Sequence, residues 1–422
     1  MDFKFIHASD IHLDSPLVGL EQYEGAPVSY VRGATRRALE NLVDLALAEE
    51  VDFVVIAGDL YDGNWRDYNT GLFFVSQMAR LNQAGIGVCM VRGNHDAASQ
   101  ITHRLRLPDN CTDFPTTRPD TVILASLGVA IHGQGFPHAA CYEDLSQNYP
   151  EPNGNYFHIG LLHTSANGRP GHDSYAPSDL NYLKNKGYNY WALGHVHRAE
   201  VLAEDPWIVF PGNVQGRHIR EEGAKGCALV TVTGDGVQVE HRPLDVLRWR
   251  HCSVDVSGAH NYDQVLEVVL DSMDTELAQS EGRCLALRMV LSGACPIHSQ
   301  LVGDVDQLGA NIRALAVDRG PDSLWVEKVK VKTHPVSWGR QALEHHPVAS
   351  LLAYFEEFGR DEEFLLQLAE ELVREANALP AEVFAEEEED WTNPRFLAEL
   401  LPHASEIIRS RLLQREGLDH ED

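Results

Sequence analysis

Five short blocks of aspartate, asparagine and histidine constrain the fold of this 422-residue chain more than any other feature. Each block follows a run of apolar residues that has the length and composition of a buried strand. The blocks are Asp10-Ile11-His12, Gly58-Asp59-Leu60-Tyr61-Asp62, Gly93-Asn94-His95-Asp96, His163 and Gly194-His195-Val196-His197. Because open α/β sheets build their sites beyond the carboxyl ends of their strands, we expect all five blocks to face one crevice.

The apolar runs alternate with helical stretches over the first 245 residues. Residues 31–50 and 70–84 carry apolar side chains at helical spacing, which predicts a helix in each range. Strands that alternate with helices indicate a layered α/β architecture. The predicted strands are Phe3–Ala8, Asp52–Ala57, Gly87–Val91, Thr121–His132, Tyr156–His163 and Tyr188–Leu193, then an antiparallel set at Trp207–Phe210, Cys227–Val232 and Val237–Arg242.

The pattern changes in the second half of the chain. Residues 249–335 read as strand, helix, strand, helix and strand, which predicts a small α+β domain. Further on, residues 347–358, 362–378 and 395–413 read as helices, with a solvated acidic run at 386–390. We therefore expect three parts, namely residues 1–248, 249–335 and an acidic helical C-terminal region at 336–422.

The side chains of the five blocks suit a transition-metal centre. Carboxylate oxygens, an amide oxygen and imidazole nitrogens favour Mn²⁺, Fe²⁺ or Zn²⁺ over a metal that prefers thiolates. Two ions in one site need a shared ligand, and Asp59 is the candidate because Gly58 before it allows a sharp turn. Such ions lie about 3.5–4 Å apart and hold the attacking and departing oxygens of an in-line displacement.

Each block also has a simpler interpretation. A single histidine is more often a hydrogen-bonded side chain than a metal ligand. Glycine followed by asparagine or aspartate is a common turn, and Asp62 can serve only to cap the next segment. Five blocks in order, each at the end of a predicted strand, favour a metal centre over these separate explanations.

The ordered set resembles the calcineurin-like metallophosphoesterase superfamily, whose pattern is Asp-x-His, Gly-Asp-x-x-Asp, Gly-Asn-His-Asp, His and Gly-His-x-His. All five blocks are intact here. Within the superfamily, residues 5–14, 57–62 and 192–197 are similar to the SbcD-type DNA-repair exonuclease group, and residues 210–218 with 225–227 to its YhaO-like branch. The resemblance implies a four-layer α/β/β/α sandwich, a small α+β cap domain and a helical C-terminal region.

The resemblance also implies a site with two divalent ions, with Mn²⁺ as the working metal. The expected ligands are Asp10, His12 and His197 for the first ion, Asn94, His163 and His195 for the second, and Asp59 for both. His95 is expected to protonate the leaving oxygen or to stabilise developing charge. Asp96 is expected to orient His95.

A basic cluster lies downstream of the ligands. Its members, Arg217, His218, Arg220 and Lys225, could contact backbone phosphates of a nucleic acid. A surface loop in which they balance the charges of Glu221 and Glu222 explains the cluster equally well. Three residues near the blocks are not expected to bind metal or to act in catalysis. His7 is expected to be structural, His132 to bind no metal, and Arg92 to pair with a nearby carboxylate.

The net charge of −29 is unfavourable for an enzyme that binds nucleic acid. Residues 340–422 hold 21 acidic and 7 basic side chains, so nearly half of the excess lies in the last fifth of the chain. The charge weakens the expectation of a DNA substrate without removing it. Seven scattered cysteines, no apolar run of about 18 residues and no signal-peptide pattern predict a cytoplasmic protein without a membrane span.

We therefore expect a Mn²⁺-dependent two-metal phosphodiesterase that acts on DNA as an exonuclease, and as an endonuclease on some substrates, in repair or recombination. A phosphodiesterase or phosphatase for small molecules is the first alternative, which the acidic charge favours. A non-catalytic scaffold is the second, against which the intact His95 argues. The resemblance further implies docking of an SbcC-like coiled-coil ATPase on the helical C-terminal region, and a homodimer stays open.

Overall fold

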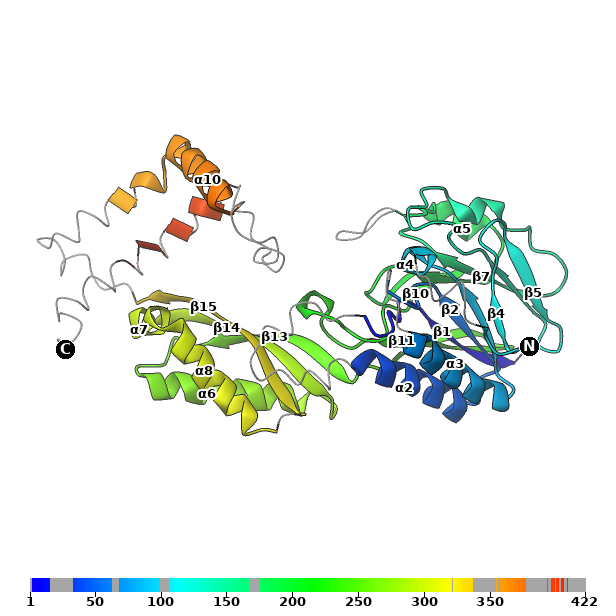
Figure 1. The fold of residues 1–422 in the computed structure, drawn as a ribbon, viewed down its shortest axis with the longest axis horizontal. Coiled ribbons are helices and arrows are strands. Elements are labelled where there is room, and N and C mark those ends of the chain that lie inside the picture. Colours follow the sequence, from blue (N-terminus) through cyan, green and yellow to red (C-terminus); the bar gives the residue numbers. More distant parts are fainter. Residues whose placement is uncertain are drawn as a thin grey trace, which may run out of the picture. The chain divides into compact units, whose positions relative to one another are not determined.

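The computed structural model describes residues 2–15, 33–62, 68–98, 106–166, 175–320, 322–336, 354–355 and 357–376, with 393, 396–398, 400–401, 404–405 and 408. The chain divides into two compact units (Figure 1). Unit 1 consists of Met1–His251, Leu277–Leu287 and Arg319–Glu327, and unit 2 of Cys252–Glu276, Arg288–Asp318 and Lys328–Asp422. The three-part division predicted from the sequence stays a prediction.

Unit 1 contains two six-stranded sheets. The first sheet has the order β12-β11-β1-β2-β3-β4. Its strands are β1 (Phe3–Ala8), β2 (Phe53–Ala57), β3 (Gly87–Val91), β4 (Cys111–Asp113), β11 (Gly226–Thr233) and β12 (Gly236–Pro243). Strands β1 to β4 are parallel, while β11 and β12 are antiparallel to their neighbours. The carboxyl ends of β1, β2 and β3 therefore meet at one edge of the sheet.

The second sheet has the order β5-β6-β7-β8-β10-β9. Its strands are β5 (Asp120–Leu124), β6 (Val129–Gly133), β7 (Phe157–His163), β8 (Tyr190–Gly194), β9 (Glu200–Glu204) and β10 (Trp207–Phe210). The central strands β6, β7, β8 and β10 are parallel, and the edge strands β5 and β9 are antiparallel. Here too the carboxyl ends of the central strands share one edge.

The central strands β1 and β2 of the first sheet are buried on both faces. Phe5 of β1 and Phe53 of β2 stack with ring centroids 4.9 Å apart and pack in the core between the two sheets, which also contains Tyr190. Their neighbours Ile6 and Val54 point to the opposite face. Burial on both faces explains why these strands read as continuous apolar runs rather than as alternating patterns.

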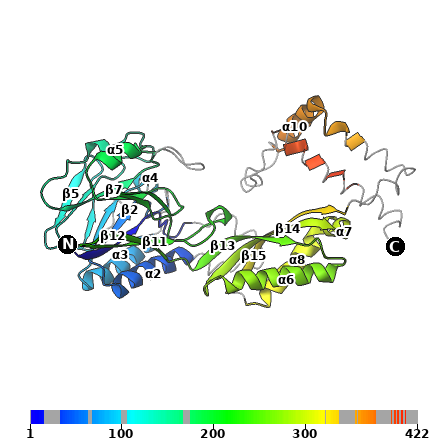
Figure 2. The ribbon, with the colours of Figure 1, turned by 180° about the vertical axis from the view of Figure 1, so that it is seen from behind.

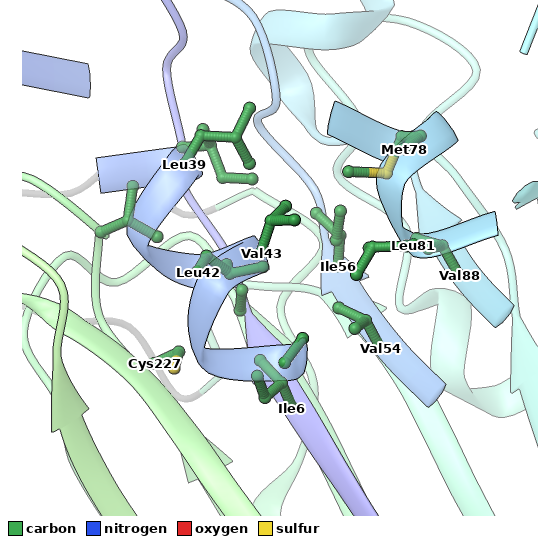
Figure 3. Packing of buried hydrophobic residues seen from close by; sticks show 14 of the residues in the cluster. Ile6, Leu39, Leu42, Val43, Val54, Ile56, Met78, Leu81, Val88 and Cys227 are labelled. Atoms are coloured by element: carbon green, nitrogen blue, oxygen red, sulfur yellow. The ribbon is translucent and has the colours of Figure 1, made fainter. Parts of the chain in front are cut away.

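Helices complete the four layers. Helices α2 (Ala34–Ala48) and α3 (Tyr68–Gln83) cover the outer face of the first sheet, where Val43 and Leu81 lie in one cluster with Ile56 (Figure 3). On the outer face of the second sheet, α5 (Leu180–Asn185) and the 3₁₀ turn η2 (Leu145–Asn148) pack through Leu183 and other buried side chains. The predicted α/β/β/α sandwich is confirmed.

Residues 247–335 form a three-stranded sheet with helices. The sheet has the order β13-β14-β15, from β13 (Leu247–Asp255), β14 (Cys284–Cys295) and β15 (Leu324–Pro335). Helices α6 (Tyr262–Ala278) and α8 (Val305–Val317) lie side by side along it, and Asn311 Nδ2 donates to the Tyr262 hydroxyl at 3.1 Å (Figure 2). The short helix α7 (His298–Gly303) precedes α8. This confirms the predicted α+β element pattern.

Two strand predictions are wrong. Strand β10 lies in the second sheet, parallel to β8, and not in an antiparallel set with β11 and β12. The range Thr121–His132 is not a single strand but the antiparallel pair β5 and β6, joined by a turn. Gly128 has a φ of +68°, and its N–H donates to the carbonyl oxygen of Ala125 at 3.3 Å. The apolar Leu127 in the turn makes the sequence look continuous, while Gly128 permits the reversal.

Part of the C-terminal region is described. Helix α10 (Glu362–Ala376) packs through Leu365 and Ala369 against Leu397 and Leu401. The predicted helices at 347–358 and 395–413 lie largely outside the described residues, and the acidic run at 386–390 lies entirely outside them. Within the described part of the chain, no helix has the length and apolar character needed to cross a membrane.

A buried chain of hydrogen bonds connects β5, β6 and β7. Thr121 Oγ1 lies 2.9 Å from His132 Nδ1, and His132 Nε2 lies 2.9 Å from His158 Nδ1. His158 Nε2 lies 3.2 Å from the carbonyl oxygen of Asn153, which can only accept, so the chain is satisfied with both imidazoles neutral. Burial lowers the pKa of His132 to about 4, helped by His158 and Lys186.

We expect the free energy of unfolding to decrease as the pH falls from 6.5 to about 4. In this range the unfolded chain binds a proton at His132, whereas the folded chain binds it only near pH 4. The contribution of the neutral His132 to the free energy of unfolding is therefore fully present above pH 6.5 and is lost as the pH falls towards 4. One group contributes at most about 1.4 kcal/mol per pH unit. Urea unfolding across this range should show a shallower pH dependence for His132→Phe than for the unaltered chain. Equal slopes would contradict the assignment.

Candidate metal centre

The ligand blocks begin where strands of the two sheets end. The first sheet supplies Asp10 and His12 after β1, Asp59 after β2, and Asn94 and His95 at the start of the short helix α4 (Asn94–Ala98) after β3. The second sheet supplies His163 at the end of β7, and His195 and His197 after β8. The structure thus brings together side chains from all five blocks.

The first group consists of Asp10, His12 and His197, each offering one ligand atom within 4.8 Å of the others. His12 Nε2 and His197 Nε2 lie 3.3 Å apart, and His197 Nε2 lies 3.7 Å from Asp10 Oδ1. Asp10 and His12 are buried. Two imidazole nitrogens and a carboxylate oxygen at this spacing fit a divalent cation.

The second group consists of Asp59, His163 and His195, again within 4.8 Å of one another. His163 Nε2 lies 3.5 Å from Asp59 Oδ2 and 3.0 Å from Asn94 Oδ1. Asp59 Oδ2 is also 3.9 Å from His12 Nε2 in the first group. Asp59 therefore faces both groups, which is the geometry expected of a shared ligand.

Hydrogen bonds outside the groups orient the donor atoms. His163 Nδ1 lies 2.8 Å from the carbonyl oxygen of Ala57, which can only accept, so Nδ1 carries the proton and Nε2 is bare. Asp59 Oδ1 accepts the backbone N–H of His95 at 2.9 Å, which directs Oδ2 towards the histidines. The donor set is therefore chemically ready for cations.

The local electrostatics agree with this. Burial by itself would raise the pKa of Asp10, but the imidazoles of His197, His163 and His12 lower it to about 2. Burial lowers the pKa of His12 to about 4, with a further contribution from Arg217. At neutral pH the carboxylate is ionised and the imidazole is neutral, which are the protonation states that metal ligands require.

The backbone at the ligands is strained. Asp10, His12, Asp59 and His195 have φ values of 51°, 44°, 52° and 104°, in the left-handed region that non-glycine residues rarely adopt. Such outliers cluster at functional sites, where the surrounding fold holds them. Close packing adds a second constraint, because a Cβ at Gly93 would lie 2.2 Å from Asp59 Oδ1.

The orienting partner of His95 differs from the prediction. His95 Nδ1 pairs with Asp62 Oδ1 at 2.7 Å, while Asp96 accepts backbone N–H groups of Leu60, Tyr61 and Gly93 at 2.9–3.1 Å. The pairing of Asp96 with His95 predicted from the sequence is therefore corrected. Adjacent residues at the start of a helix do not face each other, whereas Asp62 approaches from the neighbouring block. Burial would lower the pKa of His95, but Asp62 raises it to about 9.

Replacing these two aspartates should separate their roles. We expect Asp62→Asn to lower turnover by about 10–100-fold, because His95 loses its orienting carboxylate. Asp96→Asn should mainly lower the free energy of unfolding, since a neutral amide cannot accept all three backbone N–H groups as well. Steady-state kinetics and urea unfolding of both variants check this. The reverse pattern would restore Asp96 as the partner of His95.

The predicted basic cluster is split by the structure. Arg217 lies beside the site, with its guanidinium 3.3 Å from Glu221 Oε1, 3.4 Å from Ser15 Oγ and 3.7 Å from Asp62 Oδ2. His218 is half exposed, with Nε2 at 3.6 Å from Glu221, and Arg220 is exposed on the 3₁₀ turn η3 (Ile219–Glu221). Arg217 and His218 thus balance the charge of Glu221, and Arg217 also reaches the metal centre.

The neighbouring residues have structural contacts. His7 Nδ1 lies 3.0 Å from the Tyr190 hydroxyl and Nε2 lies 3.1 Å from the carbonyl oxygen of Leu193. Arg92 donates to Asp113 at 2.6 Å. Sequence reasoning assigned Glu221 only a charge-balancing role in a surface loop, whereas its carboxylate also contacts His197 Nδ1 at 2.6 Å.

Two stacked sheets with buried aspartate and histidine groups at their shared edge define a metallohydrolase. Residues 3–199 match the family described as calcineurin-like phosphoesterase, and residues 249–334 match the domain described as "Metallophosphoesterase YhaO, middle domain". A Bacillus subtilis relative, named "Uncharacterized metallophosphoesterase YhaO", is 34% identical over 299 residues, 70% of this chain and 73% of the relative. The chain therefore belongs to the calcineurin-like metallophosphoesterases, in their YhaO-like branch.

More distant similarities are also found. The "DNA double-strand break repair protein Mre11" of Sulfurisphaera tokodaii is 26% identical over 262 residues, 58% of this chain and 63% of that protein. Among solved structures, a dimetal phosphatase from Danio rerio is 13% identical and covers 57% of this chain and 96% of its own, with a TM-score of 0.36. The family membership makes this chain a hydrolase of phosphoester bonds that uses divalent metal ions.

Proposed function

We propose that this chain is a Mn²⁺-dependent, two-metal phosphodiesterase that cleaves DNA as an exonuclease. The observation that carries the proposal is Asp59, whose Oδ2 lies 3.9 Å from His12 Nε2 and 3.5 Å from His163 Nε2, between the two ligand groups. The similarity to a protein named for DNA double-strand break repair supports DNA as the substrate. The mixed oxygen and nitrogen donors support Mn²⁺.

The ligands would be divided between two ions. Asp10, His12 and His197 would hold one ion, Asn94, His163 and His195 the other, and Asp59 both. Bound divalent cations supply Lewis acidity, which activates water and neutralises charge on the phosphoryl group.

Two side chains beside the ligands would contact the leaving oxygen and a non-bridging oxygen of the phosphodiester. Asp62 holds Nδ1 of His95, so Nε2 is the ring nitrogen that donates a proton to the leaving oxygen. The His95 side chain is 39% exposed, which gives a substrate access to it. The Arg217 side chain is 16% exposed, its guanidinium lies beside the same carboxylate, and it would contact a non-bridging phosphate oxygen.

End-labelled DNA tests the function directly. The full chain with Mn²⁺ should release nucleotides from linear duplex, and should not do so in a chelator. Asn94→Ala should abolish the release, because its amide oxygen lies 3.0 Å from His163 Nε2, whereas the exposed Asn82→Ala on α3 should not. Hydrolysis of a small phosphodiester without any cleavage of DNA would favour the small-molecule alternative, to which the net charge of −29 is better suited. Equal DNA cleavage by both variants would remove the site assignment.

We also propose that α10 contributes to the binding of a coiled-coil ATPase. The helix buries Leu365 and Ala369, while Leu366 is 51% exposed on it. An exposed leucine beside a small apolar cluster suits a helix of a partner. Co-purification with a coiled-coil ATPase from the same organism should be lost in Leu366→Asp and kept in Glu363→Gln, an exposed neighbour. Retention in both variants would contradict the docking site.

A further inference from the structure

The segment of residues 213–222, between β10 and β11, carries a buried carboxylate beside a metal ligand. Glu221 is 6% exposed. Its carboxylate contacts His197 Nδ1 at 2.6 Å, Asn213 Nδ2 at 2.9 Å and the backbone N–H of Arg217 at 2.8 Å. The Arg217 guanidinium also donates to it at 3.3 Å. A carboxylate that is buried and surrounded by donors is part of a built arrangement and not a solvated surface charge.

This arrangement fixes both the ring and the backbone of His197. Because Glu221 only accepts, Nδ1 of His197 carries the proton and Nε2 is directed at His12 Nε2, 3.3 Å away. The carbonyl oxygen of His197 accepts from Lys225 Nζ at 3.0 Å and from the N–H of Asn213 at 3.3 Å. A carboxylate in this position fixes the tautomer of a metal-binding histidine and raises its basicity.

The first residues of β13 hold the same segment in place. The side chain of Gln215 donates to the carbonyl oxygen of Leu247 at 2.6 Å and accepts the N–H of Val246 at 2.9 Å. Trp249 Nε1 donates to the carbonyl oxygen of Gly216 at 3.0 Å. Ile219 packs in a cluster with Leu247 and Trp249. A continuous set of contacts thus connects the start of β13 to His197.

We propose that Glu221 is a positioning residue for the ion held by Asp10, His12 and His197, and that β13 sets the affinity for this ion through the segment 213–222. The inference rests on the two-metal site of the proposed function but not on DNA as the substrate. The proposal therefore predicts that the affinity for this ion depends on the segment 213–222 and that the affinity for the other ion does not, because none of these contacts reaches His163 or Asp59.

Metal titration of the apoprotein tests the proposal. Calorimetry with Mn²⁺ alone should show two equivalents on the unaltered chain. In Glu221→Gln one equivalent should bind about 10–100-fold more weakly, and the other should be unchanged. Glu240→Gln is the matched control, because this exposed side chain lies on β12, outside the segment 213–222, and accepts from Gln238 Nε2 at 2.7 Å. Unchanged binding of both equivalents by Glu221→Gln would overturn the proposal.

Two further variants distinguish positioning from a merely structural role. Glu221→Asp keeps the charge and should recover part of the lost affinity. Trp249→Phe keeps a ring in the cluster but removes one hydrogen bond to Gly216, so the same equivalent should weaken by about fivefold. Equal weakening of both equivalents in either variant would indicate a general loss of structure and would contradict the proposal.

Nitrogen NMR of the histidine rings gives a readout that needs no variant at Glu221. In the apoprotein, His197 should carry its proton on Nδ1, with the resonance assigned by its loss in His197→Gln. A proton on Nε2 would overturn the proposal. A chain that binds two equivalents of Mn²⁺, one of them weakened by Glu221→Gln, but cleaves no DNA would keep this inference and remove the exonuclease proposal.

Discussion

Asp59→Asn is expected to abolish phosphodiesterase turnover and to weaken the binding of both Mn²⁺ equivalents. Asp59 Oδ2 faces His12 Nε2 at 3.9 Å and His163 Nε2 at 3.5 Å, so one substitution removes a charged donor from both ligand groups. Changes to groups that only orient a ligand cost about 10–100-fold, and loss of the shared ligand should lower turnover by about 1000-fold or more. Kinetics with a generic phosphodiester and a Mn²⁺ titration measure both effects.

The control for this prediction is an aspartate next to the start of the same strand. Asp52 precedes β2, is exposed, and accepts the backbone N–H of Lys4 at 2.8 Å. Asp52→Asn makes the same chemical change at the opposite end of β2 from Asp59, and should leave turnover and metal binding unchanged. Loss of only one equivalent in Asp59→Asn would show that this carboxylate belongs to a single ion.

Among glycine-to-alanine substitutions in unit 1, Gly194→Ala is expected to cause one of the largest decreases in the free energy of unfolding. A Cβ at this position would lie 1.9 Å from the backbone carbonyl oxygen of Ala57, so β8 and β2 would have to separate at the edge that carries the ligands. Overpacking against backbone costs about 3 kcal/mol or more. Thermal unfolding and Mn²⁺ binding should both be impaired.

Gly87→Ala is the matched comparison. Nothing lies within 4 Å of a Cβ placed on Gly87, and its φ is not positive, so the free energy of unfolding should change by about 0.5 kcal/mol or less. If both substitutions are tolerated equally, then the close approach of β8 to β2 does not require a glycine at residue 194.

Much of the fold could be predicted because the central strands are buried on both faces. The predicted ranges of the first and third strands agree with β1 and β3, since an uninterrupted apolar run has clear ends. The edge strands β4 and β9 were not predicted, because they are short and only partly buried. In β5 and β6 a leucine in the turn concealed the reversal, and only Gly128 marked it.

The site was predictable to the extent that its residues adjoin strand ends. Asp10, Asp59 and His163 follow or end apolar runs, and parallel strands bring such positions to one edge. The partner of His95 was not predictable from spacing, because the direction of Asp96 depends on a helix of five residues, α4. The contact of Glu221 with His197 could not be predicted, because it joins residues 24 positions apart that are separated by β9 and β10.

The way in which the ligands are distributed has a mechanical consequence. Each ligand group takes side chains from both sheets: Asp10 and His12 meet His197, and Asp59 meets His163 and His195. Coordinated ions would act as cross-links between the layers, much as disulfides join the halves of other sandwiches. Chelation should therefore loosen contacts such as that of Phe5 with Tyr190, whose rings meet across the interface at 5.2 Å, and speed amide hydrogen exchange in β7 and β8.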